Sequence, residues 1–196
     1  MSNFSPKVDV TRCGWCPLDD PLYVQYHDEE WGVPLYDGRK LFALLQLEGA
    51  QAGLSWRTVL HKQEEYRRVF EQFDAERLSK WGEEKIANAL QNPGIIRNRL
   101  KVRAVVRNAL AFLEEFGGDY EKFSDYLWSF TGGEVIRNVR YGTADDPSTS
   151  PASDAMSKSL KKAGFTFVGS TICYAFMQAA GMVNDHSVDC FKRTEE

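Results

Sequence analysis

Histidine and cysteine are scarce in this chain, which has three of the first and four of the second among 196 residues. Long apolar runs are missing as well, because the longest are broken well before the roughly 20 residues that a membrane-spanning helix needs. The first ten residues, MSNFSPKVDV, lack the apolar stretch of a secretory signal. We therefore expect a cytoplasmic protein with reduced cysteines and no membrane contact.

No charge of one sign dominates, since 24 basic and 28 acidic residues leave a net charge of −4. This balance argues mildly against nucleic acid as a partner, but a basic patch can lie on an acidic protein. Such a patch is present between residues 97 and 107, where the basic side chains are Arg97, Arg99, Lys101, Arg103 and Arg107. Hydrophobic residues at 43% and a length of 196 residues suit one globular domain or two closely fused ones.

The chain follows helical patterns, without an internal repeat or a low-complexity tract. Apolar residues recur at helical spacing from Ser55 to Phe70, for example. Residues 138–152 form the main loop in this interpretation, and Ser153 caps the helix that follows. Two short β-like runs, 135–139 and 165–168, do not predict a sheet. The predicted fold class is all-α.

The scarce histidines and cysteines lie near the two ends of the chain, in a pattern that suits a metal site. His186 and Cys190, in N-D-H-S-V-D-C, have a spacing that on a helix puts both side chains on one face. Cys13 and His27 would complete a set of two thiolates and two imidazoles, which zinc binds tetrahedrally. A metal ion there would tie the two ends of the chain together and close a long loop.

Other interpretations of these residues stay open. In the simplest, Cys13 and Cys190 are free thiols and the histidines lie at the surface. Cys13-x-x-Cys16 could itself be a ligand pair or a redox motif, although a redox motif usually needs a βαβ context that a helical chain lacks. Cys173 lies in an apolar helical segment, where we expect it to be part of the core.

The stretch L-E-G-A-Q-A-G-L-S-W, residues 47–56, indicates a pocket for a flat base. It places Glu48 among apolar and small residues and ends at Trp56. A carboxylate can accept hydrogen bonds from an exocyclic amine while an indole stacks on the ring. The alternative is a surface glutamate at a helix end with a core tryptophan, and Trp15 and Tyr26 can likewise be core residues.

The stretch N-P-G-I-I-R-N-R-L-K, residues 92–101, joins two helices by a Pro-Gly turn and resembles a helix-hairpin-helix. Backbone N–H groups at such a turn and helix start can hold a phosphate, and the arginines beyond it extend the anion site. A plain turn between two helices with a solvated charged face is the alternative.

Together, these segments resemble the 3-methyladenine DNA glycosylase I family over nearly the whole chain, from Arg12 to Cys190. The motifs that carry the resemblance are, in chain order, R-C-G-W, D-P-L-Y-x-x-Y-H-D-x-E-W-G-V-P, L-E-G-x-Q-A-G-L-S-W, G-I-I-R-x-R, W-S-F, S-D-A-x-S-K-x-L-K-K, F-x-F-V-G-x-T-I-C-Y-x-F-M-Q-A-x-G and N-D-H-x-x-x-C. Several long matches in order are far more specific than any one of them.

The resemblance implies the all-α helix-hairpin-helix glycosylase fold, with a structural zinc ion that joins the N- and C-terminal segments. The implied ligands are Cys13, His27, His186 and Cys190. The implied organisation is a single unit, 1–196, with a helical helix-hairpin-helix part at about 37–135 and zinc-linked segments at about 11–36 and 150–191.

The resemblance also implies an activity: hydrolysis of the N-glycosidic bond of 3-methyladenine in alkylated duplex DNA, with base flipping and without strand cleavage. The implied catalytic or recognition residue is Glu48. The implied substrate-binding residues are Tyr26, Trp56, Trp15, Trp31 and Leu54, where Leu54 would fill the gap left by the flipped nucleotide. The DNA backbone would be held by Gly94, Ile95, Arg97 and Arg99. We expect a monomer without a nucleotide cofactor.

Two other classes of function are compatible with these patterns. A non-catalytic module that binds methylated adenine or damaged DNA would keep the pocket and the basic hairpin, and only turnover separates it from an enzyme. A zinc-stapled or thiol-based interaction protein would lack affinity for DNA, so salt-dependent binding to duplex DNA would count against it.

Overall fold

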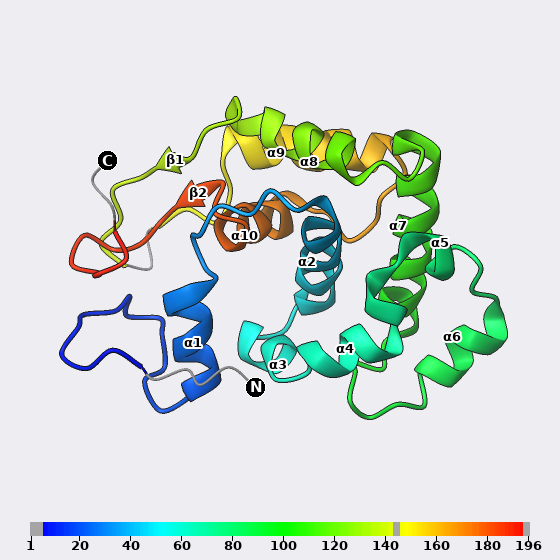
Figure 1. The fold of residues 1–196 in the computed structure, drawn as a ribbon, viewed down its shortest axis with the longest axis horizontal. Coiled ribbons are helices and arrows are strands. Elements are labelled where there is room, and N and C mark those ends of the chain that lie inside the picture. The colour runs from blue at the N-terminus through cyan, green and yellow to red at the C-terminus, as the bar shows by residue number, and fades with distance from the viewer. Residues whose placement is uncertain (1–5, 143–145, 194–196) are drawn as a thin grey trace.

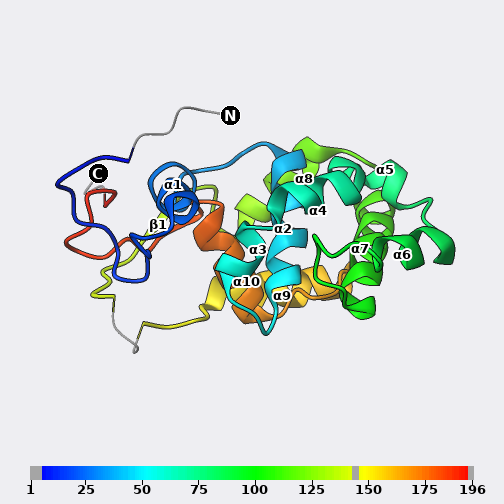
Figure 2. The same cartoon turned by 90° about the horizontal axis from the view of Figure 1, so that it is seen from below.

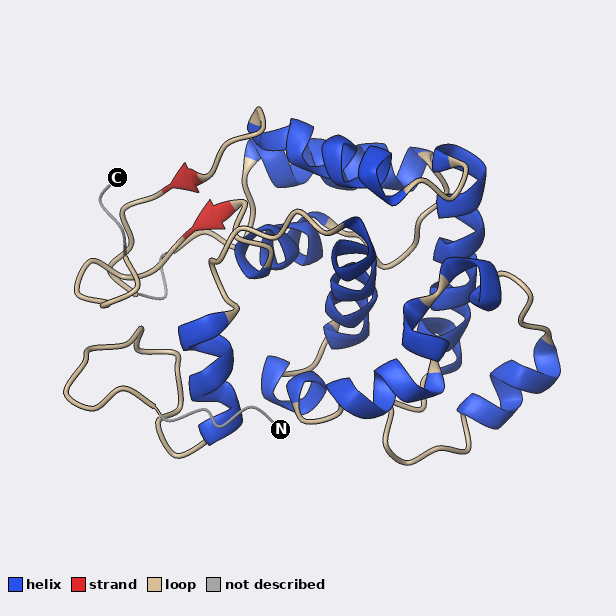
Figure 3. Ribbon diagram, viewed as in Figure 1, coloured by secondary structure: helices blue, strands red, loops and turns tan. Residues whose placement is uncertain are grey.

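The computed structural model describes residues 6–142 and 146–193, and helices are the main secondary structure in both ranges (Figure 3). In chain order the elements are α1 (Pro21–Glu29), α2 (Gly38–Gln51), α3 (Trp56–Leu60), α4 (Gln63–Val69), η1 (Glu71–Phe73), α5 (Ala75–Leu78), α6 (Glu83–Ala89), α7 (Arg99–Phe116), α8 (Tyr120–Trp128), η2 (Ser129–Thr131), β1 (Ile136–Arg137), α9 (Pro151–Lys162), α10 (Ser170–Ala179) and β2 (Val183–Asn184). The all-α prediction is confirmed. None of the helices in the described ranges is long and apolar enough to cross a membrane.

Helix α2 lies at the centre of the molecule, with α3, α7, α8 and α10 packed around it (Figure 1). It begins where the Asp37 carboxylate accepts hydrogen bonds from the first backbone amides. Leu41, Phe42 and Leu45 are at most 1% exposed, and buried positions continue to the last turn. When a helix is buried on nearly every face, its polar side chains lie in the protein interior as well as its apolar ones. Glu48, in its last turn, is therefore inside the protein.

The predicted Pro-Gly turn joins α6 to α7. The side chain of Asn98 caps α7 by accepting hydrogen bonds from the backbone amides of Leu100 and Lys101. The helix ends at Gly117, whose φ of +66° is the left-handed conformation that favours glycine at a helix C-terminus. Both ends of this long helix thus follow from the sequence.

Two predicted helix boundaries were wrong. The segment from Ser55 to Phe70 is two helices, α3 and α4, because the chain turns after Leu60 while the apolar residues on both sides still face one core. Periodicity does not reveal such a break. Helix α9 is capped by Ser150 instead of Ser153, since Pro151 suits the first helical position and the Ser153 hydroxyl accepts a hydrogen bond from the Ser150 amide.

The chain also contains a minimal sheet that the sequence did not predict. Strand β1, inside the β-like run 135–139, pairs in parallel with β2, and Ile136 lies opposite Val183. The other run, 165–168, forms no strand. A pair of two-residue strands forms only because distant parts of the chain meet, so a β-like run such as 135–139 does not by itself predict it.

The segments before α2 and after α10 lie side by side at one end of the molecule, blue and red in Figures 1 and 2. Backbone hydrogen bonds join them: Phe191 N donates to Thr11 O at 3.0 Å, and Leu35 N donates to Ala180 O at 3.0 Å. This contact between sequence-distant segments builds both the cavity and the metal centre.

Candidate active site and metal centre

A cavity of about 440 Å³ opens between the N-terminal segment, the last turn of α2, helix α10 and the C-terminal segment. Aromatic side chains form much of its wall, from Trp15, Tyr23, Tyr26, Trp31 and Trp56. Its polar wall includes Glu48, Gln51, Arg140, Tyr174, Gln178 and Asp185. Aromatic rings around a few polar groups suit a flat, polar-edged ligand.

Glu48 is the most unusual group in this wall. It is 2% exposed, and its Oε2 has no hydrogen-bond partner in the described part of the chain. Burial raises the pKa of its carboxyl group to about 8. A buried carboxyl with an unsatisfied oxygen on a cavity is typical of a binding or catalytic site, and the interpretation of Glu48 as a surface residue was wrong.

Tyr26 and Trp56 face each other beside this carboxyl. Their ring centroids are 5.3 Å apart with the planes tilted by 42°, and the Trp56 Nε1 atom also has no partner among the described residues. Trp31 meets Trp15 edge-on at 4.7 Å, and Trp15 remains 39% exposed at the surface. The four aromatic residues singled out for the pocket therefore all line one cavity.

Tyr23 lines the cavity too, and the sequence analysis did not single it out as a site residue. It lies one helical turn before Tyr26 on α1, and the two rings meet edge-on at 6.1 Å. That spacing was the available signal, because residues three apart share a helix face.

A polar cluster in the cavity wall was also missed. The Asp185 carboxylate accepts hydrogen bonds from Tyr174 Oη at 2.6 Å, Gln178 Nε2 at 2.8 Å and Arg140 Nε at 3.0 Å. Burial is the main cause that raises the pKa of Tyr174 to about 12, and the bond to Asp185 adds to it. These residues come from three separate segments, so no local motif joins them.

Leu54 lies outside the cavity wall, in the short loop between α2 and α3, and is 43% exposed. The loop turns at Gly53, whose φ is +75°. Leu54 is thus an apolar side chain at the surface, in the loop between Gln51 and Trp56, which both line the cavity.

The hairpin turn divides its predicted residues between two environments. Ile95 is buried at 2% exposure, whereas Arg97 and Arg99 are exposed. The Gly94 amide already donates to the Asn92 side chain at 2.7 Å, and a Cβ at Gly94 would lie 2.2 Å from Glu65 Cγ. The turn is thus packed from inside and presents its arginines outward.

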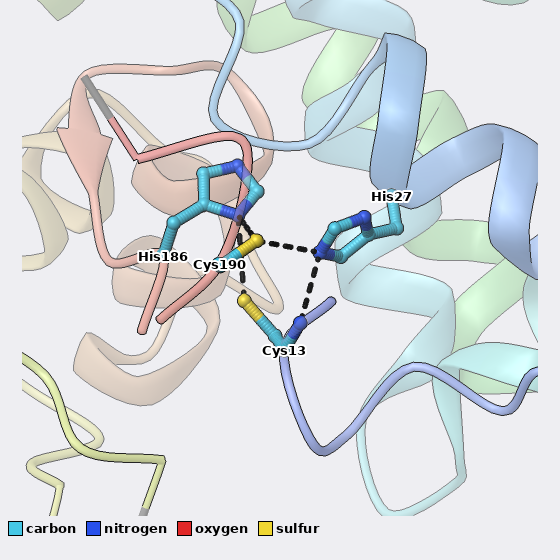
Figure 4. Close-up of side chains that lie close together, drawn as sticks. All are labelled: Cys13, His27, His186 and Cys190. Atoms are coloured by element: carbon cyan, nitrogen blue, oxygen red, sulfur yellow. Dashed lines mark hydrogen bonds between the residues drawn. The ribbon is translucent and has the colours of Figure 1, made fainter. Parts of the chain in front are cut away.

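The four residues of the expected metal site meet in one buried cluster (Figure 4). Their ligand atoms, from Cys13, His27, His186 and Cys190, all lie within 4.8 Å of one another. His186 Nδ1 is 3.4 Å from both sulfurs, and His27 Nε2 is 3.5 Å from Cys190 Sγ. Two thiols and two imidazoles at these distances suit a metal ion, and the interpretation with surface histidines was wrong.

The second nitrogen of each imidazole is held by an oxygen. His27 Nδ1 is 2.8 Å from the Asp28 carboxylate, and His186 Nε2 is 3.2 Å from the Trp31 carbonyl oxygen. An N–H directed at those oxygens leaves the lone pairs of His27 Nε2 and His186 Nδ1 pointing at the sulfurs. Arg12 closes the arrangement with a bidentate pair to Asp28.

The two thiols of the cluster are electrostatically unequal. Hydrogen bonding from Cys13 is the main cause that lowers the pKa of Cys190, and the two histidines add to it. The neighbouring Cys190 sulfur and burial raise the pKa of Cys13. Deprotonation of Cys190 is therefore favoured and deprotonation of Cys13 disfavoured, because one proton is shared between the two sulfurs.

Cys16 is outside the cluster although its side chain is buried. Its amide donates to the Cys13 carbonyl at 2.9 Å, so the turn directs the two sulfurs differently. Cys173 is fully buried, as expected of a core residue. His186 and Cys190 lie in a turn after β2 and not on a helix, so the helical argument for their shared direction was wrong although the pairing was right.

Comparison with known proteins gives one consistent family. The model of the methyladenine glycosylase family matches residues 15–193. DNA-3-methyladenine glycosylase 1 of Escherichia coli strain K12 is 51% identical over 182 residues, which cover 92% of this chain and 96% of that protein. A crystal structure of 3-methyladenine DNA glycosylase I superposes with a TM-score of 0.89 at 51% identity, covering 94% of this chain and 100% of that one. A variant of such an enzyme in complex with 3-methyladenine has a TM-score of 0.87 at 34% identity, covering 94% and 98%.

Proposed function

This chain belongs to the methyladenine glycosylase family, and from that membership we propose that its aromatic cavity receives 3-methyladenine flipped out of alkylated DNA. The protein is a DNA glycosylase that removes 3-methyladenine from DNA. The observation that carries the assignment of the site is Glu48, a buried carboxyl with an unsatisfied oxygen on a cavity lined by aromatic rings.

Glu48 is the residue that distinguishes the methylated base. Its oxygen accepts a hydrogen bond from the exocyclic amine of the base. The positive charge that N3-methylation creates favours the ionised form of this carboxyl, whose pKa burial otherwise raises. Tyr26 and Trp56 stack on the cationic ring, a contact worth about 1–2 kcal/mol when desolvated. Extrusion is cheaper for a damaged base, by a few kcal/mol at most, because the lesion pairs and stacks less well.

Cleavage needs little acid catalysis, because the methylated base is already a cationic leaving group. Water adds its oxygen to C1′ of the deoxyribose, the glycosidic bond breaks, and its electron pair leaves with the base as neutral 3-methyladenine. The proton lost by the water passes to solvent. The cavity wall of the described residues includes no lysine that could form a Schiff base, which supports hydrolysis without strand cleavage.

Three parts of the chain hold the DNA in this proposal. Leu54 enters the duplex where the nucleotide leaves it. Arg97 and Arg99 pair with phosphates beyond the hairpin, and the backbone at Gly94 and Ile95 faces the same strand. The exposed Leu54 and the exposed arginines support these roles.

The metal we assign to the cluster is zinc, in a structural role. A tetrahedral zinc ion separates a sulfur from a nitrogen ligand by about 3.6 Å, close to the sulfur–nitrogen distances of 3.4 and 3.5 Å in the cluster. Four protein ligands leave no open position for water, so the ion would hold the terminal segments together without taking part in hydrolysis. We propose that residues 1–196 form one unit around this centre and act as a monomer.

Release of free base is the test of this function. Purified, metal-loaded protein is incubated with methylated duplex DNA, and liberated 3-methyladenine is quantified for the native chain, for Glu48→Ala and for Glu114→Ala. Glu114 is an exposed α7 residue and serves as the control. We expect release by the native chain and the control, and a loss of at least about 100-fold in Glu48→Ala.

The outcomes separate the enzyme from the assignment of its site. Equal release by Glu48→Ala would keep the glycosylase and reject the role of Glu48. No release by a folded native protein that still binds 3-methyladenine would replace the enzyme by a binding module.

A further inference from the structure

The loop that carries Leu54 is clamped by a lysine from another helix. The Lys101 ammonium, in the first turn of α7, donates hydrogen bonds to Ala52 O at 2.6 Å and to Ala50 O at 2.8 Å. We infer that Lys101 is a positioning residue that fixes the Leu54 loop for insertion into DNA, and that it is not a phosphate contact. This inference rests on the proposed function, since Leu54 needs a fixed position only if it enters a duplex.

The end of α2 receives a cation from another helix. The last turn of this helix contains no basic residue to interact with its exposed carbonyls. Gly49 O and Gln51 O accept from the backbone amides of Ala52 and Leu54, at 3.3 and 2.7 Å. The Lys101 ammonium donates to the two carbonyls that alternate with these, Ala50 O and Ala52 O. All four consecutive carbonyls from residue 49 to residue 52 therefore accept a hydrogen bond. The path of the chain into Gly53 and Leu54 is thereby set.

Lys101 differs from the basic residues around it. Its side chain is partly buried, and burial lowers the pKa of its ammonium group. Arg99 is exposed, and Arg103 is exposed and pairs with Glu83 at 2.6 Å. The basic patch predicted from the sequence is therefore not one surface. Two of the three N–H donors of the Lys101 ammonium are bonded to carbonyl oxygens of the protein.

The clamp links the two elements that the proposed function places on DNA. The Lys101 backbone amide donates to Asn98 at the start of α7, directly after the hairpin, while its ammonium holds the end of α2. On the far side of the loop, Ser55 caps α3 by accepting from the Thr58 amide. Because both ends of the loop are fixed, Leu54 keeps a constant position relative to the hairpin. Phosphate contacts at the hairpin therefore determine where Leu54 contacts the stacked bases.

Lys101→Met removes the ammonium and keeps the length of the apolar stem. We expect kcat/KM for release of 3-methyladenine to fall at least about tenfold, because a small misplacement at a site can cost far more than one lost hydrogen bond. Binding is measured on a duplex with a stable abasic-site analogue, from about 50 to 200 mM salt. We expect weaker binding with an unchanged slope of log affinity against log salt. Arg99→Met, the matched loss of one charge, should reduce that slope by about one.

A cycle with Leu54→Ala tests whether the effect passes through the loop. If Lys101 acts by placing Leu54, the double variant loses little more affinity than the weaker-binding single variant. Additive losses, a salt slope reduced as in Arg99→Met, or native affinity and kcat/KM in Lys101→Met would each overturn the inference. Lys101→Gln, which retains an amide donor, should fall between native and Met, and it replaces Met if that variant does not fold. If the native chain releases no base, the proposed function is refuted and not this inference. The salt slope and the double-mutant cycle are measured by DNA binding alone and do not depend on base release.

Discussion

Burial of Glu48 links the stability of the protein to pH. Its pKa rises from 4.5 to about 8 in the folded chain, so between these values the folded state holds a proton that the unfolded state has released. Stability contributed by this proton is complete below about pH 4.5 and is lost as the pH rises through 8. Glu48→Gln has no such titration. We therefore compare the unfolding free energy of Glu48→Gln with that of the native protein by urea unfolding. The difference, variant minus native, should be larger at pH 9 than at pH 5 by on the order of 2–5 kcal/mol.

Glu114→Gln is the control for that measurement, because this exposed side chain should leave the pH dependence of stability unchanged. Parallel stability curves for Glu48→Gln and native protein would show that Glu48 is ionised throughout. The raised pKa would then be wrong, and an additional group would have to pair with the carboxylate.

At this scale the sequence predicted residues whose signal is local. Glu48 and Trp56 stand in one short motif, and their burial on one cavity follows from the direction of a single helix and loop. It did not predict Arg140 or Asp185, which meet only through tertiary contacts. The sequence indicated Cys13 as the ligand but left open whether Cys16 competes with it, since the choice depends on how one turn directs two sulfurs.

The start of α9 gives a test at the scale of an element. The structure makes Ser150 the N-cap and Ser153 the third helical residue. At an N-cap, glycine replaces serine at a cost of a few tenths of a kcal/mol while alanine costs about 1 kcal/mol. Inside a helix the order reverses, because alanine is favoured over glycine by up to about 1 kcal/mol. We expect Ser150→Gly to be more stable than Ser150→Ala, and Ser153→Ala more stable than Ser153→Gly, in thermal unfolding.

If the order were reversed at both positions, the helix would begin at Ser153, as the sequence alone suggested. That prediction rests on the rule that a serine before an apolar pattern caps a helix. Two serines, Ser150 and Ser153, satisfy the rule here. Proline at 151 was the deciding signal, since it marks the first helical position. Helix α7 has local start and stop residues, Asn98 and Gly117, whereas β1 and β2 exist only because distant segments meet.

For the molecule as a whole, the metal centre is the feature that holds its ends together. His186 follows Cys13 by 173 residues, so an ion bound to both closes nearly the whole chain. By analogy with a covalent cross-link, such a closure contributes on the order of 2–5 kcal/mol by restricting the unfolded chain. We expect one zinc ion per chain in metal analysis, and a marked fall in the thermal midpoint when a strong chelator removes it.

Cys13→Ser and Cys16→Ser form a matched pair for this prediction, because both sulfurs are buried and lie in the same turn. Cys13→Ser should lose the ion and unfold at the same temperature with or without chelator. Cys16→Ser should keep one ion per chain and the full response to chelator. Loss of the ion in Cys16→Ser alone would show that Cys16 is the ligand and would contradict the cluster in Figure 4.

Because the segments joined by the metal centre also form one wall of the cavity, metal-free protein should bind 3-methyladenine more weakly even where its helices remain folded.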